Sequence, residues 1–332
     1  MTAGTSALTQ DDVHRAISSH GDNPSAFLAL NSGNSYFSVP GLDGVIVYRT
    51  SGPFLVQFAG PFAPADRAPE LLRHFVEFAA AQGRGVVSVQ VQENEVGLYA
   101  QEGFTVNQVG ASYAVDLARF TLRGTRFMQL RNKIARAARA GLTVVEGTLR
   151  EWEDGVAAVD RAWLGSKGEH AHELEFLVGQ MGGPAQDHRR LFVGIIEGEV
   201  VGYISYSPAY GSRPGWLHDL SRRIPGDVPG IMESINQTAI STFTAEGAKW
   251  LHFGFTPFTS LAPETESPNA SAAFGWFVQW LWEYGDAVYP AQSQLAYKHK
   301  WAPHVVLPEY IAFHGRAQAG GLVHVFKAAK AV

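Results

Sequence analysis

The sequence contains no cysteine and no apolar run long enough to cross a bilayer. Without cysteine there is no disulfide, no thiolate nucleophile and no cysteine-ligated zinc site. The longest apolar runs, 191–196 and 272–282, are short or broken by polar residues, whereas a spanning helix needs roughly 20 apolar residues. Residues 1–12 are polar and acidic, unlike a signal peptide. We therefore expect a cytoplasmic protein without an integral membrane segment.

Motifs for metals and dinucleotides are also missing. The 12 histidines include no His-Glu-x-x-His pattern, which is the commonest helical zinc signature. Gly83–Gly85 precedes a predicted strand, which is the wrong order for a dinucleotide-binding turn. We expect neither a metal nor a cofactor.

The chain is long enough for two domains. It has 332 residues, of which 46% are hydrophobic and 17% charged, which suits a globular protein with sizeable cores. Hydrophobic patterning predicts a first series of strands and helices at 44–48, 54–58, 69–81, 86–91, 95–101 and 106–115. It predicts a second series at 191–196, 200–206, 216–220, 228–244, 250–255, 271–284 and 292–297.

Both series run hairpin, helix, strand, helix and strand, except that the second has an additional strand before its first helix. This repeat predicts an α/β protein with two tandem lobes of the acetyltransferase (GNAT) type. The expected division is an N-terminal lobe at 1–120, a basic connecting helix at 121–141 and a C-terminal catalytic lobe at 142–332.

The segment 117–145 contains no acidic residue, although the chain has a net charge of -5. Its basic residues are Arg119, Arg123, Arg126, Arg131, Lys133, Arg136 and Arg139. A helix that lacks acids for i,i+4 pairing is suited to a polyanion, either nucleic acid or anionic lipid. The alternative interpretation is a solvated helix face.

Charged residues collect near the end of the strand predicted at 216–220. Asp219 and Arg222 lie there, and Glu233 lies in the following helix. Ligands of α/β proteins bind beyond the carboxyl ends of strands, which favours a site over a structural ion pair. Lys298 and Lys300 end the last predicted strand, where alternation places both on one side. They would bind phosphate or an oxyanion, or they would only discourage edge pairing.

Acetyl-coenzyme A enzymes of this type hold the pyrophosphate with a Gln/Arg-x-x-Gly-x-Gly/Ala loop before a helix. The nearest match begins at Arg223, but it lacks the final small residue and places Asp227 near the phosphates. Acyl-CoA-dependent N-acyl transfer is therefore an alternative rather than the first choice.

Several short motifs occur together in order: 33–37, 99–104, 120–124, 130–131, 136–141, 219–222, 254–257 and 297–303. Together they resemble the catalytic domain of the phosphatidylglycerol lysyltransferase, or aminoacyl-phosphatidylglycerol synthase, family. The resemblance covers nearly the whole chain after residue 30. It implies two acetyltransferase-like lobes, an aminoacyl-tRNA donor, a basic helix beside a tunnel where lipid and tRNA ends meet, and no coenzyme A.

The same resemblance implies the site residues. The tRNA-binding residues would be Arg123, Arg126, Arg131, Lys133, Arg136 and Arg139. The catalytic residues would be Asp219, Arg222, Glu233, Lys298 and Lys300. We expect the lysines to contact phosphate or the oxyanion, Arg222 to contact the terminal nucleotides, and the two carboxylates to bind the donor's α-ammonium or the acceptor.

The chain departs from the family in three respects. Lipid-modifying members carry a membrane flippase region ahead of this domain, which this chain does not show, and Ser221 and Trp301 replace more apolar or phenylalanine residues. Soluble relatives transfer amino acids to small molecules in natural-product pathways. We therefore expect a small-molecule acceptor, with phosphatidylglycerol as the alternative and a catalytically inactive tRNA- or lipid-binding module as a further one.

Overall fold

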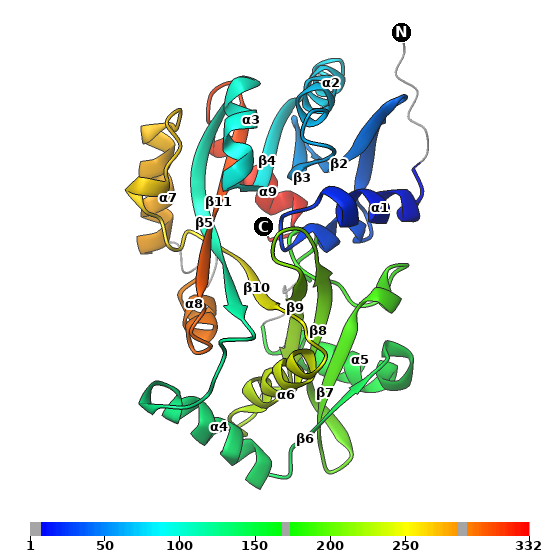
Figure 1. Ribbon diagram of the computed structural model, residues 1–332, viewed down its shortest axis with the longest axis vertical. Coiled ribbons are helices and arrows are strands. Elements are labelled where there is room, and N and C mark those ends of the chain that lie inside the picture. The colour runs from blue at the N-terminus through cyan, green and yellow to red at the C-terminus, as the bar shows by residue number, and fades with distance from the viewer. Residues whose placement is uncertain (1–7, 168–172, 285–290, 332) are drawn as a thin grey trace.

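The computed structural model describes residues 8–167, 173–284 and 291–331. Within these residues, eleven strands form one mixed sheet in the order β1-β2-β3-β4-β11-β5-β10-β9-β8-β7-β6 (Figure 1). The strands are β1 (Ser35–Val39), β2 (Leu42–Ser51), β3 (Phe54–Phe62), β4 (Gly85–Gln92), β5 (Phe104–Asp116), β6 (Thr143–Gly147), β7 (Arg190–Ile196), β8 (Glu199–Ala209), β9 (Gly215–Arg223), β10 (Trp250–Pro257) and β11 (Val305–His314). The helices are α1 (Gln10–His20), α2 (Ala68–Ala80), α3 (Val96–Gln101), α4 (Met128–Arg139), α5 (Leu149–Gly165), α6 (Ile231–Ala245), α7 (Ala272–Tyr284), α8 (Ala291–His299) and α9 (Ala319–Ala328).

The α/β class predicted from the sequence is confirmed, and most predicted elements are present within a few residues. The hairpin around Glu197 and Gly198 is β7–β8, in which both turn residues have positive φ. The helix α2 begins beside Pro69, as expected for a proline in the first turn. These elements were predictable because they depend on local periodicity and turn residues.

The last strand of the sheet joins its two halves. β11 comes from the C-terminal part of the chain but pairs antiparallel with both β4 and β5. The other edge of β5 pairs with β10, so the two halves of the sheet are continuous. Figure 1 shows β11 and β5 running together through the middle of the molecule. The expected tandem-lobe division therefore remains a proposal.

The prediction of a strand at 292–297 is wrong, because this segment is part of the helix α8 (Ala291–His299). Its sequence AQSQLAYKH contains no β-branched residue and is rich in helix-favouring side chains. Lys298 and Lys300 therefore do not share a strand face. Lys298 lies in the last turn of the helix and Lys300 lies beyond its end.

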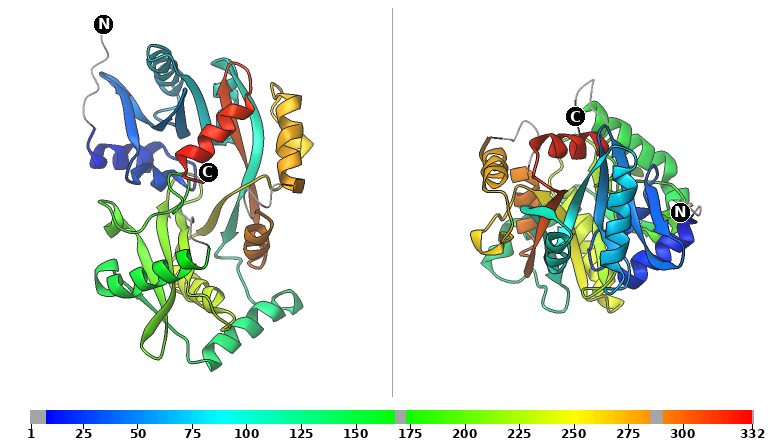
Figure 2. Two further views of the ribbon diagram at one scale, coloured as in Figure 1. Left: turned by 180° about the vertical axis from the view of Figure 1, so that it is seen from behind. Right: turned by 90° about the horizontal axis from the view of Figure 1, so that it is seen from above.

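Helices cover both faces of the sheet (Figure 2). In the N-terminal half, α2 and α3 pack on one face, and α1, α7 and α9 belong to the other core. In the C-terminal half, α4, α6 and α8 share one core, and α5 packs against β8 and β9 in another. In the part of the chain that the structure describes, no helix has both the length and the apolar character that crossing a membrane requires.

Two pairs of neighbouring strands part near the centre of the sheet. β3 and β4 pair in parallel as far as Phe58 and Val89, and the next residues, Ala59 and Gln90, both have positive φ. β9 and β10 pair in parallel only from Gly215 to Leu217 and from Trp250 to His252. Past these points the strands of each pair are no longer paired with each other. Their separation leaves room for a ligand in the middle of the fold.

Candidate active site

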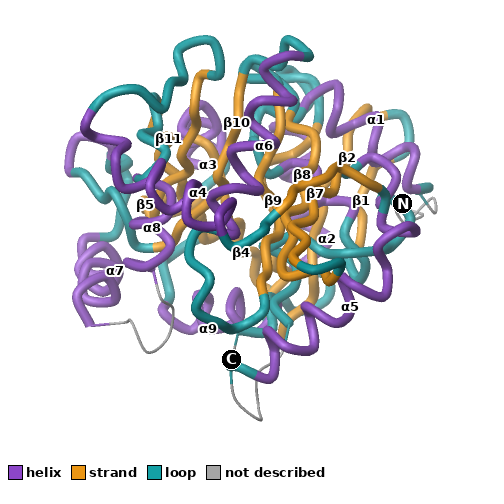
Figure 3. Tube along the Cα trace, turned by 90° about the horizontal axis from the view of Figure 1, so that it is seen from below, coloured by secondary structure: helices purple, strands orange, loops and turns teal. Residues whose placement is uncertain are grey.

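A cavity of about 450 Å³ lies at this central position. β4, β5, β9, β10 and β11 contribute to its wall, together with α8, α9 and the segment 174–179. Most lining residues are apolar, including Leu322, Val325 and Phe326 of α9. In Figure 3, viewed from below, strands from both halves of the sheet run through the centre of the molecule and α9 lies along one side. A mainly apolar cavity with a few polar groups is typical of a ligand site.

Asp219 of β9 lines the cavity, and its side chain is fully buried in an ion pair. Its Oδ2 accepts a hydrogen bond from Nε of Arg189 at 3.1 Å, and Arg189 donates another to Oδ1 of Asn31 at 2.9 Å. Burial raises the pKa of the Asp219 carboxyl above its usual range, and the Arg189 charge opposes that shift. Oδ1 of Asp219 is buried beside Gly179, and the Ser207 hydroxyl lies close enough to help hold the pKa of the carboxyl down.

Arg222 also lines the cavity and is held by two acids. Its Nη1 lies 2.9 Å from a carboxylate oxygen of Asp160 and 2.7 Å from one of Glu173. Its guanidinium carbon lies 4.9 Å from the ring centroid of Trp163. These contacts fix the position of the guanidinium at the cavity wall.

Lys298 brings a buried amine to the cavity. Its Nζ donates hydrogen bonds to the carbonyl oxygens of Gly254 at 2.7 Å and Phe255 at 3.0 Å. Burial lowers the pKa of the Lys298 ammonium to about 7, against the attraction of Glu309. Burial in turn raises the pKa of Glu309 to about 7, and the Ser112 hydroxyl donates to that carboxyl. The bulge of β10 at Gly254, where φ is +67°, presents the first of these carbonyls.

Glu233 and Lys300 do not line the cavity. Nζ of Lys300 lies 3.1 Å from Oε1 of Glu233, and Nζ of Lys133 lies 3.6 Å from the same oxygen. This cluster joins α4, α6 and the end of α8. Met232 and Tyr297 of the cavity wall are its neighbours. The structure thus separates the five expected catalytic residues into three at the cavity and two at an adjacent helix junction.

The basic residues of segment 121–141 divide in a similar way. Arg123, Arg126, Arg136 and Arg139 are exposed and have no acidic partner within the described residues. Arg131 instead donates to the carbonyl oxygens of Leu122 and Gly124. Lys133 is engaged with Glu233. Arg131 is exposed as well, but its guanidinium is engaged, so the other four arginines are the ones free to contact a polyanion.

α4 is docked closely on α6. Gly230, before the first turn of α6, has φ of +87°, and a Cβ there would lie 2.2 Å from the carbonyl oxygen of Lys133. Only glycine allows both this conformation and this approach. The basic helix is therefore held in a defined position next to the junction that borders the cavity.

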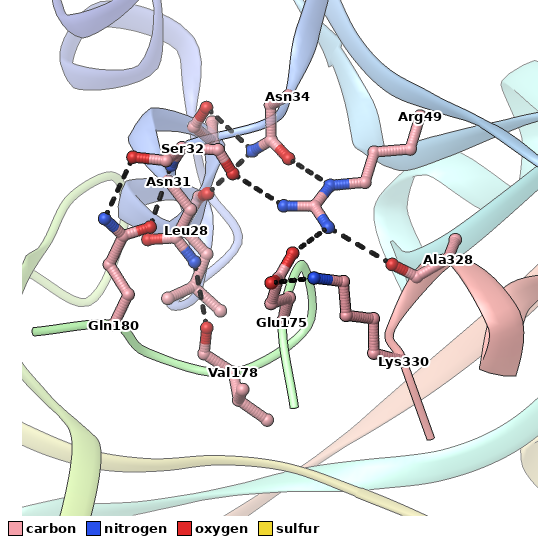
Figure 4. Close-up of polar contacts among 11 residues, drawn as sticks. Leu28, Asn31, Ser32, Asn34, Arg49, Glu175, Val178, Gln180, Ala328 and Lys330 are labelled. Carbon is pink, nitrogen blue, oxygen red and sulfur yellow. Dashed lines mark hydrogen bonds and ion pairs between the residues drawn. The ribbon is translucent and has the colours of Figure 1, made fainter. Parts of the chain in front are cut away.

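A polar network that sequence reasoning missed holds the segment 173–180 over the cavity (Figure 4). The Arg49 guanidinium binds Glu175 at 2.9 Å and also the carbonyl oxygens of Ser32 and Ala328. Lys330 binds the same carboxylate of Glu175 at 2.6 Å. These charges lie on three distant parts of the chain, so no local pattern indicates that they meet.

The described residues contain no group of three or more His, Cys, Asp or Glu side chains that could hold a metal ion. The charged groups of the described cavity wall are the Asp219 carboxyl, the Arg222 guanidinium and the buried Lys298 amine.

These residues lie within a sequence that matches a family model. The model, described as "Phosphatidylglycerol lysyltransferase, C-terminal", matches residues 14–313. The chain belongs to this family. The resemblance inferred from the sequence is thereby confirmed.

Curated relatives in this family are larger proteins. The chain is 25% identical over 234 residues to a phosphatidylglycerol lysyltransferase of Bacillus subtilis, covering 68% of this chain and 26% of that protein. It is 23% identical over 295 residues to the lysylphosphatidylglycerol biosynthesis bifunctional protein LysX of Rhodococcus opacus, covering 85% of this chain and 26% of that protein. The chain thus spans about a quarter of their length.

Solved structures share the fold across almost the whole chain. The C-terminal domain of a putative lysylphosphatidylglycerol synthetase from Agrobacterium fabrum has a TM-score of 0.79 at 20% identity, covering 97% of this chain and 98% of that one. L-PGS from Bacillus licheniformis has a TM-score of 0.77 at 21% identity, covering 96% of each chain. At these identities the likeness establishes the fold of the family domain.

Proposed function

We propose that this chain transfers an amino acid from the 3′ ester of an aminoacyl-tRNA to a hydroxyl of phosphatidylglycerol. The observation that carries the proposal is the central cavity, in which Asp219, Arg222 and Lys298 meet a largely apolar wall. Such a cavity suits an amphipathic acceptor, since it offers polar groups at one side and apolar surface at the other. The names of the relatives point to the same acceptor.

The chemistry requires no activating cofactor, because the ester of an aminoacyl-tRNA is already activated. The acceptor hydroxyl oxygen attacks the ester carbonyl carbon, a tetrahedral oxyanion forms, and the ribose oxygen leaves with a proton. The protein must orient the two substrates, accept the hydroxyl proton and return a proton to the ribose. The Asp219 carboxyl at the cavity wall suits the α-ammonium of the amino acid, and Arg222 suits the terminal nucleotide.

Lys298 suits the role of the base better than the contact with phosphate or the oxyanion that was expected from the sequence. A neutral amine has two N–H bonds, and the carbonyls of Gly254 and Phe255 accept both. The lone pair then remains for the acceptor hydroxyl. A pKa of about 7 keeps a large share of the amine neutral at physiological pH.

The remaining expectations are part of the same proposal. We infer two tandem acetyltransferase-like lobes with boundaries at 1–120, 121–141 and 142–332, and a cytoplasmic location. We also infer tRNA contacts on the exposed arginines in and just before α4, namely Arg123, Arg126, Arg136 and Arg139. The small-molecule acceptor expected from the sequence has no support from the relatives, whose names refer to phosphatidylglycerol. The lipid acceptor therefore replaces it as the first choice.

The test uses a labelled pool of aminoacyl-tRNA, the purified chain and vesicles that contain phosphatidylglycerol. The proposal expects label in the organic phase, and it expects RNase pretreatment or omission of phosphatidylglycerol to abolish that signal. Label only in a soluble product would replace the lipid with a small-molecule acceptor. Transfer that is insensitive to RNase and dependent on an acyl-CoA would overturn the donor.

A further inference from the structure

Gln90 is a cavity residue that has no role in the mechanism proposed above. It lies on β4, lines the cavity and is only 1% exposed. Neither the Nε2 nor the Oε1 atom of its carboxamide has a hydrogen-bond partner within the described structure. A buried carboxamide without partners is unfavourable, and a polar ligand in the cavity would satisfy it.

The backbone at Gln90 is unusual as well. Its φ is +55°, a conformation that residues other than glycine rarely adopt. The side chain of Asn23 holds the bulge by donating a hydrogen bond to the carbonyl oxygen of Gln90 at 2.7 Å. Strain of this kind persists only where the surrounding structure enforces it, and it is concentrated at functional sites. It occurs where β3 and β4 stop pairing and the cavity begins.

The neighbouring strand shows what a structural glutamine does in this fold. Gln57 of β3 is fully buried, its Nε2 donates to the Tyr99 hydroxyl at 2.7 Å, and its Oε1 accepts from Ser88 at 2.8 Å. Gln57 is not among the residues of the cavity wall. The protein itself satisfies the carboxamide of Gln57, which lies away from the cavity, but not that of Gln90, which faces it.

The surroundings of Gln90 define its ligand. The charged cavity residues Asp219, Arg222 and Lys298 all come from β9 and α8, in the C-terminal part of the chain. The N-terminal residues around Gln90 are uncharged, as in Ser25, Leu28 and Val89. A carboxamide offers one acceptor and one donor group side by side. Its natural partner in an uncharged wall is a neutral group that both donates and accepts, as two adjacent hydroxyls do.

We propose that Gln90 binds the vicinal diol of the acceptor's glycerol head group and selects acceptors that carry both hydroxyls. Oε1 accepts from one hydroxyl, and Nε2 donates to the oxygen of the other. This assignment rests on the proposed transfer to phosphatidylglycerol. It makes Gln90 a specificity-determining residue that acts from the N-terminal half on a reaction centred on Asp219 and Lys298.

The experiment compares phosphatidylglycerol with phosphatidyl-1,3-propanediol, which keeps one hydroxyl to accept the amino acid but lacks the neighbouring one. We expect the native chain to prefer phosphatidylglycerol by roughly 10- to 100-fold in kcat/KM, as sites built to bind a substrate hydroxyl do. The variant Gln90→Met should reduce that ratio to within about threefold of unity, mainly by raising the KM for the lipid. The KM for aminoacyl-tRNA should not change.

Two further variants separate recognition from folding. Gln90→Met removes no hydrogen bond of the protein, so its Tm should equal or exceed that of the native chain. The matched control Gln57→Met breaks two buried hydrogen bonds and should lower the Tm while keeping the lipid preference. Gln90→Asn keeps a carboxamide and tolerates positive φ, so it should keep part of the preference.

A full preference for phosphatidylglycerol in Gln90→Met, with native Tm, would overturn the assignment while leaving the proposed function intact. So would a loss of preference that is equally large in Gln57→Met. A native chain that transfers to neither lipid would overturn the proposed function together with this inference. The native chain and the variants thus distinguish the two failures.

Discussion

At the scale of single residues, Lys298 links burial to chemistry. Its pKa is lowered to about 7 by burial, and a base acts only in its neutral form. Because the neutral fraction grows as pH rises, we expect kcat/KM to increase through about pH 7 and then level off. Lys298→Met should lose this step and roughly 10²- to 10⁴-fold in rate. Initial rates of lipid labelling between pH 5.5 and 8.5 measure both effects.

The control for this prediction is Lys300→Met. Lys300 pairs with Glu233 away from the cavity wall, so this variant should retain the step at pH 7 even where its rate is lower. A rate that falls as pH rises through 7 would contradict the assignment. It would mean that Lys298 acts as a cation, as the sequence-based expectation of an oxyanion contact has it.

Arg189 is the residue on which the buried charge of Asp219 depends. The side chains of both are almost completely buried, at 1% and 0% exposure. Arg189→Met would leave the carboxylate without its partner, and we expect a loss of about 3–5 kcal/mol in the free energy of unfolding. Arg15→Met, at an exposed pair with Asp12, should cost at most about 1 kcal/mol. Denaturant titration measures the free energy of unfolding of both variants. Equal losses of this free energy would show that the buried pair has no special role.

At the scale of elements, α4 combines exposed arginines with a firm attachment to α6. Its exposed residues Arg136 and Arg139 lie in the last turn. Replacing both with glutamine should weaken tRNA binding and reduce the slope of log K against log salt by roughly 0.7–0.9 per arginine. Filter binding at several salt concentrations measures the slope.

The control is Arg67→Gln, beside α2 at the opposite end of the molecule in Figure 1, which should leave the slope unchanged. A native slope in the double variant would remove α4 from the tRNA site.

At the scale of the whole molecule, β11 makes the two halves interdependent. It fills the space between β4 and β5. In a fragment of residues 1–141, β4 therefore loses one of its two neighbours, and β5, which pairs with β10 and β11, loses both. We expect this fragment to lack a cooperative thermal transition, and the full chain to unfold in one transition. Joining residues 303–332 to the fragment through a flexible linker should restore folding, since this piece contains β11 and α9. Circular dichroism melts test both, and cooperative melting of residues 1–141 alone would contradict the prediction.

The sequence by itself determined what short-range chemistry controls. The hairpin at Glu197 and Gly198, the helix begun at Pro69 and the acid-free segment 117–145 all depend on residues close together in the chain. The ordered motifs between residues 33 and 303 were also sufficient to indicate the family, which the match over 14–313 confirms. These features survive folding because turn residues, periodicity and charge runs act locally.

Only the tertiary structure decided how distant residues meet. The segment 292–297 was wrongly predicted as a strand, and the helix α8 that it forms places Lys298 and Lys300 in different surroundings. Arg189 reaches Asn31, 158 positions away, and β11 crosses from the C-terminal part of the chain into the first half of the sheet. Whether the carboxamide of Gln90 finds a hydrogen-bond partner likewise depends on its neighbours in the fold. Such contacts arise from long-range pairing and burial, which leave no periodic trace in the sequence.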